Sequence, residues 1–172
     1  VILKGLGKLQ EAELSYQKAI QIKPDYAEAH YNLGIILRDL GKLQESFNSC
    51  LRVIEVNPSF PNIYSFITEL LRDSDPSQLN KSKLRNILNL LLERNDVTHK
   101  DLLKAFNFIY INEIINNLEK INSDFSEIEL LINDQILINA LKKIIFCDLK
   151  LEKVLTKVRR NICHRISKNI KT

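Results

Sequence analysis

The chain has 172 residues, of which 45% are hydrophobic and 27% are charged, so it can bury a substantial core and remain soluble. All four glycines precede residue 42 and no proline follows Pro76. This distribution argues against β-sandwiches and β-barrels, because those folds need frequent turn residues. The net charge is +4, but Lys142–Thr172 alone carries ten Lys or Arg and two Asp or Glu. We expect an all-α chain with a basic C-terminal segment.

Two short segments recur along the chain with the same spacing. Gly7–Glu11 reads GKLQE and is repeated as Gly41–Glu45. Ala19–Pro24 reads AIQIKP and is matched by Val53–Pro58, which reads VIEVNP. Apolar residues around these segments recur at spacings of three and four, which is typical of amphipathic helices. The sequence therefore predicts repeated antiparallel helical hairpins with a period of about 34 residues.

The repeat unit from Ala27 to about Phe60 is complete. Its first helix carries His30, Leu33, Gly34 and Leu37, and its second helix carries Ser46, Cys50 and Val53 before the closing Pro58. This pattern and its period resemble the tetratricopeptide repeat. The resemblance implies an α-solenoid that binds proteins or peptides.

Two parts are expected in the chain. Residues 1–72 resemble a tetratricopeptide array with one truncated repeat, one full repeat and one half repeat, and residues 73–172 are predicted to be an α-helical extension. The extension is expected to hold four longer helices, over about 77–94, 98–121, 126–146 and from 148 onward. We favour continued stacking of antiparallel pairs, and a compact four-helix bundle packed on the last repeat is the alternative.

Individual positions are expected to have definite structural roles. Gly34 should let the two helices of the hairpin approach, since no Cβ intervenes, and Gly41 should end the first helix at a positive φ. His30 occupies the Trp-like place of the repeat and is expected to pack rather than to react. Ser77 or a neighbouring residue is expected to cap one helix, and Thr98 is expected to open the next with an approximate capping box.

The stacked first helices are expected to line a groove that holds an extended peptide or a partner helix. The candidates for this groove are residues that avoid the apolar stripes: Glu28, Tyr31, Asn32, Ile35, Arg38, Asp39, Asn62, Ser65 and Glu69. Asn32 stands where glycosyltransferase-type arrays place a row of asparagines, but Phe66 occupies the equivalent place in the next helix. An ordinary solvent-exposed surface is the alternative interpretation.

The segment Tyr26–Gly34 (YAEAHYNLG) resembles repeats of bacterial multi-repeat proteins and of O-linked N-acetylglucosamine transferases. The resemblance implies an alternative function, as the substrate-recruiting arm of a larger methyltransferase or glycosyltransferase whose catalytic domain lies outside these residues. A chain without Met that starts within a repeat is expected to be a fragment of a longer protein.

The last predicted helix is basic and amphipathic. Its cations surround an apolar stripe: Lys150, Lys153, Lys157, Arg159, Arg160, Arg165 and Lys168. Binding to an anionic surface is therefore a third possible function. No aromatic residue interleaves with these cations, so we favour packing of the stripe on the preceding helix or on a following domain, and expect neither nucleic acid nor membrane as a partner.

No catalytic residue, metal site or cofactor is predicted. A zinc site needs four convergent ligands, and no spacing supplies them among His30, His99, His164, Cys50, Cys147 and Cys163. No Ser/His/Asp or Cys/His set follows from spacing either, so we expect a non-enzymatic chain with a protein or peptide partner. The odd number of cysteines and the lack of a signal peptide favour reduced thiols and a cytoplasmic location.

Overall fold

The computed structural model describes residues 8–111, 139, 140, 142, 143 and 156, and all regular structure within these ranges is helical. The first helices are α1 (Leu9–Ile22), α2 (Ala27–Asp39), α3 (Leu43–Val56) and α4 (Ile63–Asp73). They are followed by the 3₁₀ helix η2 (Pro76–Gln78), α5 (Lys81–Glu93), the 3₁₀ helix η3 (His99–Leu102), α6 (Leu103–Phe106) and the π-helix η4 (Asn107–Ile111).

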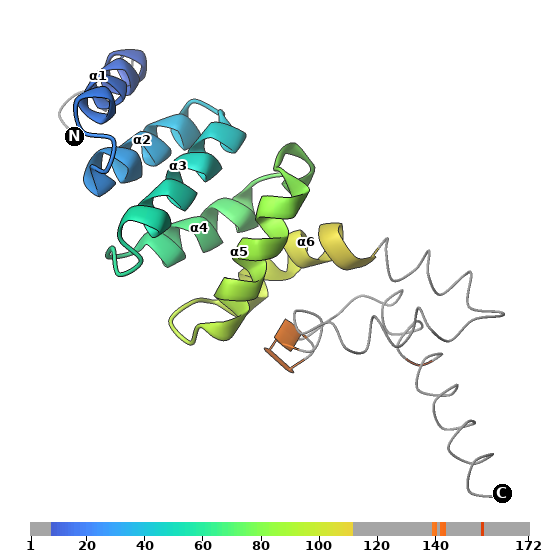
Figure 1. The fold of residues 1–172 in the computed structure, drawn as a ribbon. Coiled ribbons are helices and arrows are strands. Elements are labelled where there is room, and N and C mark those ends of the chain that lie inside the picture. Colours follow the sequence, from blue (N-terminus) through green and yellow to red (C-terminus); the bar gives the residue numbers. More distant parts are fainter. Residues whose placement is uncertain (1–7, 112–138, 141, 144–155, 157–172) are drawn as a thin grey trace, which may run out of the picture.

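The helices are stacked in chain order, as Figure 1 shows. Helix α1 packs on α2, α2 on α3 and α3 on α4, and then η3 and α6 pack on both α4 and α5. Most helices thus pack on elements that are close to them in the sequence, which is the arrangement of a solenoid. The predicted all-α solenoid is confirmed.

Two glycines allow the α2–α3 hairpin to form. A Cβ at Gly34 would lie 3.3 Å from the Cys50 sulfur, so the helices approach as predicted. Gly41 has a φ of +75°, and the following Lys42 N–H donates to the Leu37 carbonyl at 2.8 Å. A left-handed glycine with such a bond ends a helix by satisfying its last carbonyls.

The α4–α5 hairpin has different residues at the position of Gly34 and in the turn between its helices. Thr68 stands one repeat after Gly34 and is buried, with its hydroxyl donating to the Tyr64 carbonyl at 2.8 Å. The turn after α4 contains η2, whose N-cap Asp75 accepts a hydrogen bond from the Ser77 N–H at 3.0 Å. The second hairpin therefore turns through η2, without the Gly-Lys sequence of the first.

One predicted helix start is displaced, and one predicted capping bond is absent. Helix α5 begins at Lys81 rather than at Ser77, because the η2 turn comes first and the Asn80 side chain accepts the Lys83 N–H at 3.0 Å. Thr98 does precede η3, but its side chain makes no capping bond. The expected helix over 98–121 is helical as far as residue 111, and the rest of it lies outside the described residues.

One hydrophobic core extends from α2 to η4 among the described residues. Its buried residues extend from Ala27 through Leu71 and Leu84 to Tyr110, and they include Ala140. The core therefore continues past residue 72. The division into residues 1–72 and 73–172 stays a prediction, and so do the helices expected over 126–146 and from 148 onward, since most of these residues lie outside the described ranges.

Candidate functional site

Aromatic contacts join the first helices α2 and α4. The ring of Tyr31 lies 5.6 Å from the ring of Phe66 in an edge arrangement, and 5.0 Å from the ring of Phe60. The outward side chains of the two helices consequently belong to one surface. We call it the α2/α4 face, and it comprises Glu28, Tyr31, Asn32, Ile35, Arg38, Ser65, Phe66 and Glu69.

Arg38 is the cation of the α2/α4 face. Its guanidinium carbon lies 5.0 Å from the centroid of the Phe66 ring, and its Nη2 contacts the Asp39 carboxylate at 3.2 Å. Burial, together with the nearby Cys50 and Glu69, raises the pKa of Tyr31 above its ordinary value. At neutral pH the face therefore presents a neutral phenol beside a guanidinium.

The structure places the predicted groove residues at different depths. Tyr31, Asn32, Ile35 and Arg38 are half-buried. The remaining candidates are exposed: Glu28, Asp39, Asn62, Ser65 and Glu69. Phe66 occupies the place of the next asparagine in the row of asparagines. It is only 5% exposed and forms part of the floor of the predicted groove. That these residues bind a partner stays a prediction.

An Arg-Asp pair recurs at the ends of both first helices. Arg72 Nε lies 2.7 Å from the Asp73 carboxylate, one repeat after the Arg38–Asp39 pair. The hydrogen bond from Arg72 lowers the pKa of Asp73. Sequence analysis missed this pair, although the dipeptide repeated with the period of the array was a readable signal.

The Trp-like position makes the same contact in both hairpins. His30 Nε2 lies 2.9 Å from the Pro24 carbonyl oxygen, and the Tyr64 hydroxyl donates to the Pro58 carbonyl at 2.8 Å. His30 is 9% exposed, so its predicted packing role is confirmed. In each hairpin this contact attaches the loop before the first helix to that helix.

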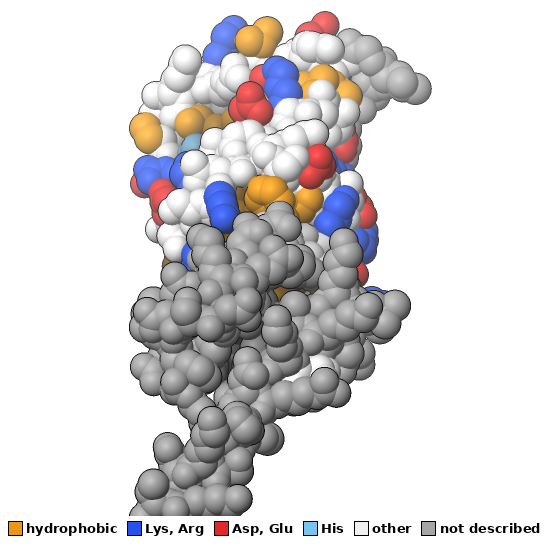
Figure 2. All heavy atoms as spheres, turned by 90° about the vertical axis from the view of Figure 1, so that its right-hand side faces the viewer, with side chains coloured by type: hydrophobic (Ala, Val, Ile, Leu, Met, Phe, Trp, Pro, Cys, Tyr) orange, Lys and Arg blue, Asp and Glu red, His pale blue; other side chains and the backbone are white. Residues whose placement is uncertain are grey.

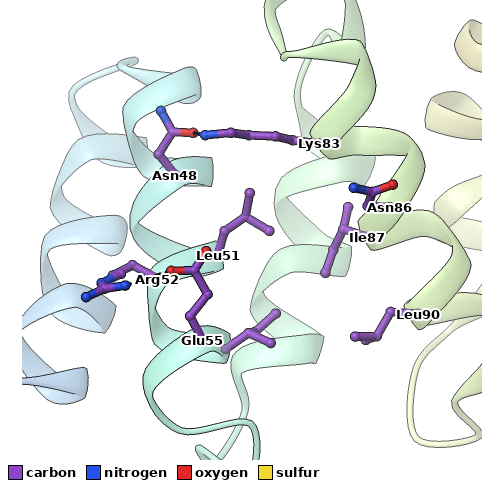
Figure 3. Close-up of a pocket in the computed structure, with 9 residues that line it drawn as sticks. Asn48, Leu51, Arg52, Glu55, Lys83, Asn86, Ile87 and Leu90 are labelled. Carbon is purple, nitrogen blue, oxygen red and sulfur yellow. Dashed lines mark hydrogen bonds and ion pairs between the residues drawn. The ribbon is translucent and has the colours of Figure 1, made fainter. Parts of the chain in front are cut away.

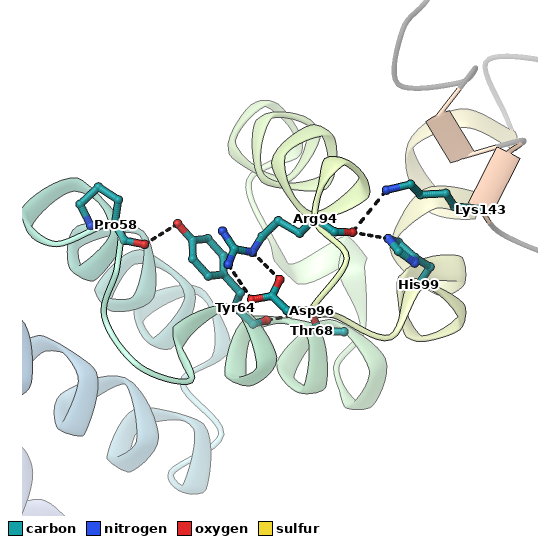
Figure 4. Close-up of polar contacts among 7 residues, drawn as sticks. All are labelled: Pro58, Tyr64, Thr68, Arg94, Asp96, His99 and Lys143. Atoms are coloured by element: carbon teal, nitrogen blue, oxygen red, sulfur yellow. Dashed lines mark hydrogen bonds and ion pairs between the residues drawn. The ribbon is translucent and has the colours of Figure 1, made fainter.

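Arg94, at the end of α5, contacts the ring of Tyr64 (Figure 4). Its guanidinium carbon lies 3.6 Å from the centroid of the Tyr64 ring, and its Nε and Nη2 donate to the Asp96 carboxylate at 2.7 and 2.6 Å. The hydrogen bond to Asp96 raises the pKa of Arg94. The Arg94 carbonyl in turn lies 2.9 Å from His99 Nε2 and accepts from Lys143 Nζ at 3.3 Å.

A cavity lies between the second helices α3 and α5, away from the predicted groove (Figure 3). Its volume is about 450 Å³, and it is lined by Asn48, Leu51, Arg52, Ile54, Glu55, Lys83, Asn86, Ile87 and Leu90. Sequence analysis did not find it, because helices of two different hairpins must be placed side by side before their surfaces can be compared.

Charged and apolar side chains are interspersed on the described part of the face that Figure 2 shows. In the view of Figure 2, hydrophobic side chains form small patches between Lys, Arg, Asp and Glu. Among the described residues, no helix is long and apolar enough to cross a membrane, and no three His, Cys, Asp or Glu side chains gather as metal ligands. The seven cations of the predicted basic helix lie outside the described ranges.

Two family models match the part of the chain that holds helices α1 to α3. A model described as TPR repeat matches residues 2–41, and a model described as Tetratricopeptide repeat matches residues 27–60. Residues 2–60 are tetratricopeptide repeats. Tetratricopeptide repeats generally serve as protein-interaction scaffolds, and that general role applies here. The comparison with curated proteins finds no match.

Proposed function

We propose that the α2/α4 face binds an extended peptide segment of a partner protein. The observation that carries the proposal is the packing of Tyr31 and Arg38 on Phe66, which makes one surface from two helices. Tyrosine and arginine supply much of the binding energy at protein interfaces, since each combines a large apolar area with hydrogen-bonding groups. The protein would thus act as a scaffold without catalysis of its own.

Asn32 is the residue best suited to hold a peptide backbone. Asn32 is half-buried on α2, where it follows Tyr31 in the sequence. An amide group both donates and accepts, so it can pair with the N–H and C=O of an extended chain whatever the side chains are. This contact would fix the path of the peptide without demanding a particular sequence.

The charge of the face favours a basic peptide. Glu28 and Glu69 are exposed on α2 and α4, and the Arg38 guanidinium is already paired with Asp39. Interfaces place opposite charges against each other, chiefly for selectivity and association rate. We therefore expect Lys or Arg to flank the bound segment.

The test begins with peptides selected from a random library on the whole chain, whose affinities are then measured by titration calorimetry. Asn32→Ala should weaken their binding by about fivefold or more, a loss typical of a central polar contact. The matched control is Gln10→Ala, an exposed amide on α1. Peptides that bind the Asn32→Ala and Gln10→Ala chains equally well would contradict the proposal.

A further inference from the structure

The cavity between α3 and α5 has an apolar floor built from two matching pairs of residues. Leu51 and Ile54 project from α3, and Ile87 and Leu90 from α5, so that both pairs have an i, i+3 spacing. Leu51, Ile54 and Leu90 are only partly buried although they are aliphatic. Two facing aliphatic ridges with this spacing form a groove that suits the i, i+3 and i+4 side chains of a third helix.

Polar groups close one end of the groove and border the other. Lys83 Nζ donates to the Asn48 Oδ1 at 2.9 Å across the groove. Arg52 pairs with Glu55 on the same helix at 2.8 Å, so their charges offset each other. Among the described residues, no carboxylate lies within ion-pair distance of Lys83, which leaves this rim with one uncompensated positive charge.

The start of α5 strengthens this positive potential. Lys81 and Lys83 lie in the first turn of α5, which contains no acidic residue. A helix N-terminus carries a partial positive charge, so cations there are unfavourable and a neighbouring anion is favourable. A carboxylate placed next to Lys83 would therefore be attracted both by the ammonium and by the end of the helix.

We infer that the α3/α5 groove docks an amphipathic helix of a partner protein, with aliphatic side chains facing Leu51 and Leu90 and with an Asp or Glu at Lys83. The groove is formed by second helices and lies apart from the α2/α4 face. The two surfaces also differ in charge preference, because the groove takes an acidic segment and the α2/α4 face a basic one. Such a protein can hold two partner segments at once.

The test uses the whole chain and three fluorescein-labelled peptides of about 15 residues, the length at which isolated helices become stable. The first carries leucines at i, i+3, i+4 and i+7 with Glu on the flanks, the second has Lys in place of Glu, and the third has Ser in place of Leu. Fluorescence anisotropy should show binding of the first peptide with a Kd below about 1 mM and at least about fivefold weaker binding of the other two.

Two lysine variants on α5 locate the binding site. Lys83→Glu should weaken the binding of the acidic leucine peptide by about fivefold or more. Lys81→Glu is a matched charge reversal on an exposed residue outside the cavity, and it should change the affinity for this peptide by less than about twofold. Asn32→Ala should leave this peptide unaffected, which separates the result from that at the α2/α4 face. No binding of the acidic leucine peptide, equal binding of all three peptides, or equal effects of the two lysine variants would overturn the inference.

Discussion

The guanidinium of Arg94 stacks on the ring of Tyr64, with its central carbon 3.6 Å from the ring centroid. Arg94 ends α5, and Tyr64 lies in the first turn of α4 with its hydroxyl bound to the Pro58 carbonyl. The contact thus joins both helices of the second hairpin to the loop before it. The first hairpin is held instead by the close approach at Gly34, a position that Thr68 fills in the second.

Replacing Arg94 by Ala should lower the free energy of unfolding by about 1 kcal/mol, because the stacking on Tyr64 is lost together with an ion pair. Urea denaturation followed by circular dichroism measures this change. Arg72 is the matched control, since it forms a similar pair with Asp73 on the surface and has no aromatic ring among its described contacts. If Arg72→Ala shifts the urea midpoint as much as Arg94→Ala, the ring contact contributes nothing.

Tyr64→Phe removes the hydroxyl and should lower the free energy of unfolding by about 1 kcal/mol. This is the usual net contribution of a hydrogen bond whose acceptor stays partly buried when the donor is lost. Tyr26→Phe is the control, because Tyr26 is 39% exposed and no hydroxyl contact is found for it among the described residues. Thermal unfolding of both variants should show a lower midpoint for Tyr64→Phe alone. Identical midpoints would show that the Pro58 contact does not stabilise the hairpin.

Gly41→Ala should destabilise the chain by about 1 kcal/mol, since a Cβ is strained at a φ of +75°. No atom lies within 4 Å of the position that the Cβ would occupy, so the loss comes from the backbone conformation and not from a clash. Asn tolerates the left-handed region better than Ala, so Gly41→Asn should lower the free energy of unfolding by less than Gly41→Ala does. Denaturant titration of the wild type and the two variants gives their order of stability. A Gly41→Ala chain as stable as the wild type would refute the explanation by backbone strain.

The Cys50 thiol should resist alkylation in the folded chain. Burial raises its pKa from 9.0 to about 12, and the thiolate is the form that reacts. The folded state therefore favours the protonated thiol, a contribution to stability that is complete below pH 9 and is lost as the pH rises toward 12. Peptide mapping after iodoacetamide treatment at pH 8 should find Cys50 unmodified until urea is added. Rapid labelling without urea would contradict its burial.

The repeat period explains why so much of the tetratricopeptide part could be predicted. A repeated sequence places equivalent residues in equivalent surroundings, so Gly34, Gly41 and His30 could each be assigned a role from the repeat pattern alone. Helix α2 begins at Ala27, where the complete repeat was expected to start, for the same reason. The half repeat expected up to residue 72 corresponds to α4, which starts at Ile63 after a left-handed Asn62.

Features that depend on contacts between distant residues could not be predicted. Helix α3 starts at Leu43 and α5 at Lys81, an offset longer than the repeat period, so the period no longer indicates which residues of the two helices face each other. The pairing of Lys83 with Asn48, and the stacking of Arg94 on Tyr64, follow from that packing and have no local sequence signal. The Tyr31 side chain was predicted to face a partner, but part of its role is to pack on the rings of α4 and of the loop before it.

The most direct test of binding at the α2/α4 face is a chemical-shift titration of the ¹⁵N-labelled chain with a library-selected peptide that carries Lys or Arg. Binding at this face should perturb amides that cluster at residues 28–39 of α2 and 63–69 of α4, whereas the amide signals of Asn48 and Lys83 should not shift. Perturbations gathered on α3 and α5, or spread evenly over the chain, would contradict the proposal.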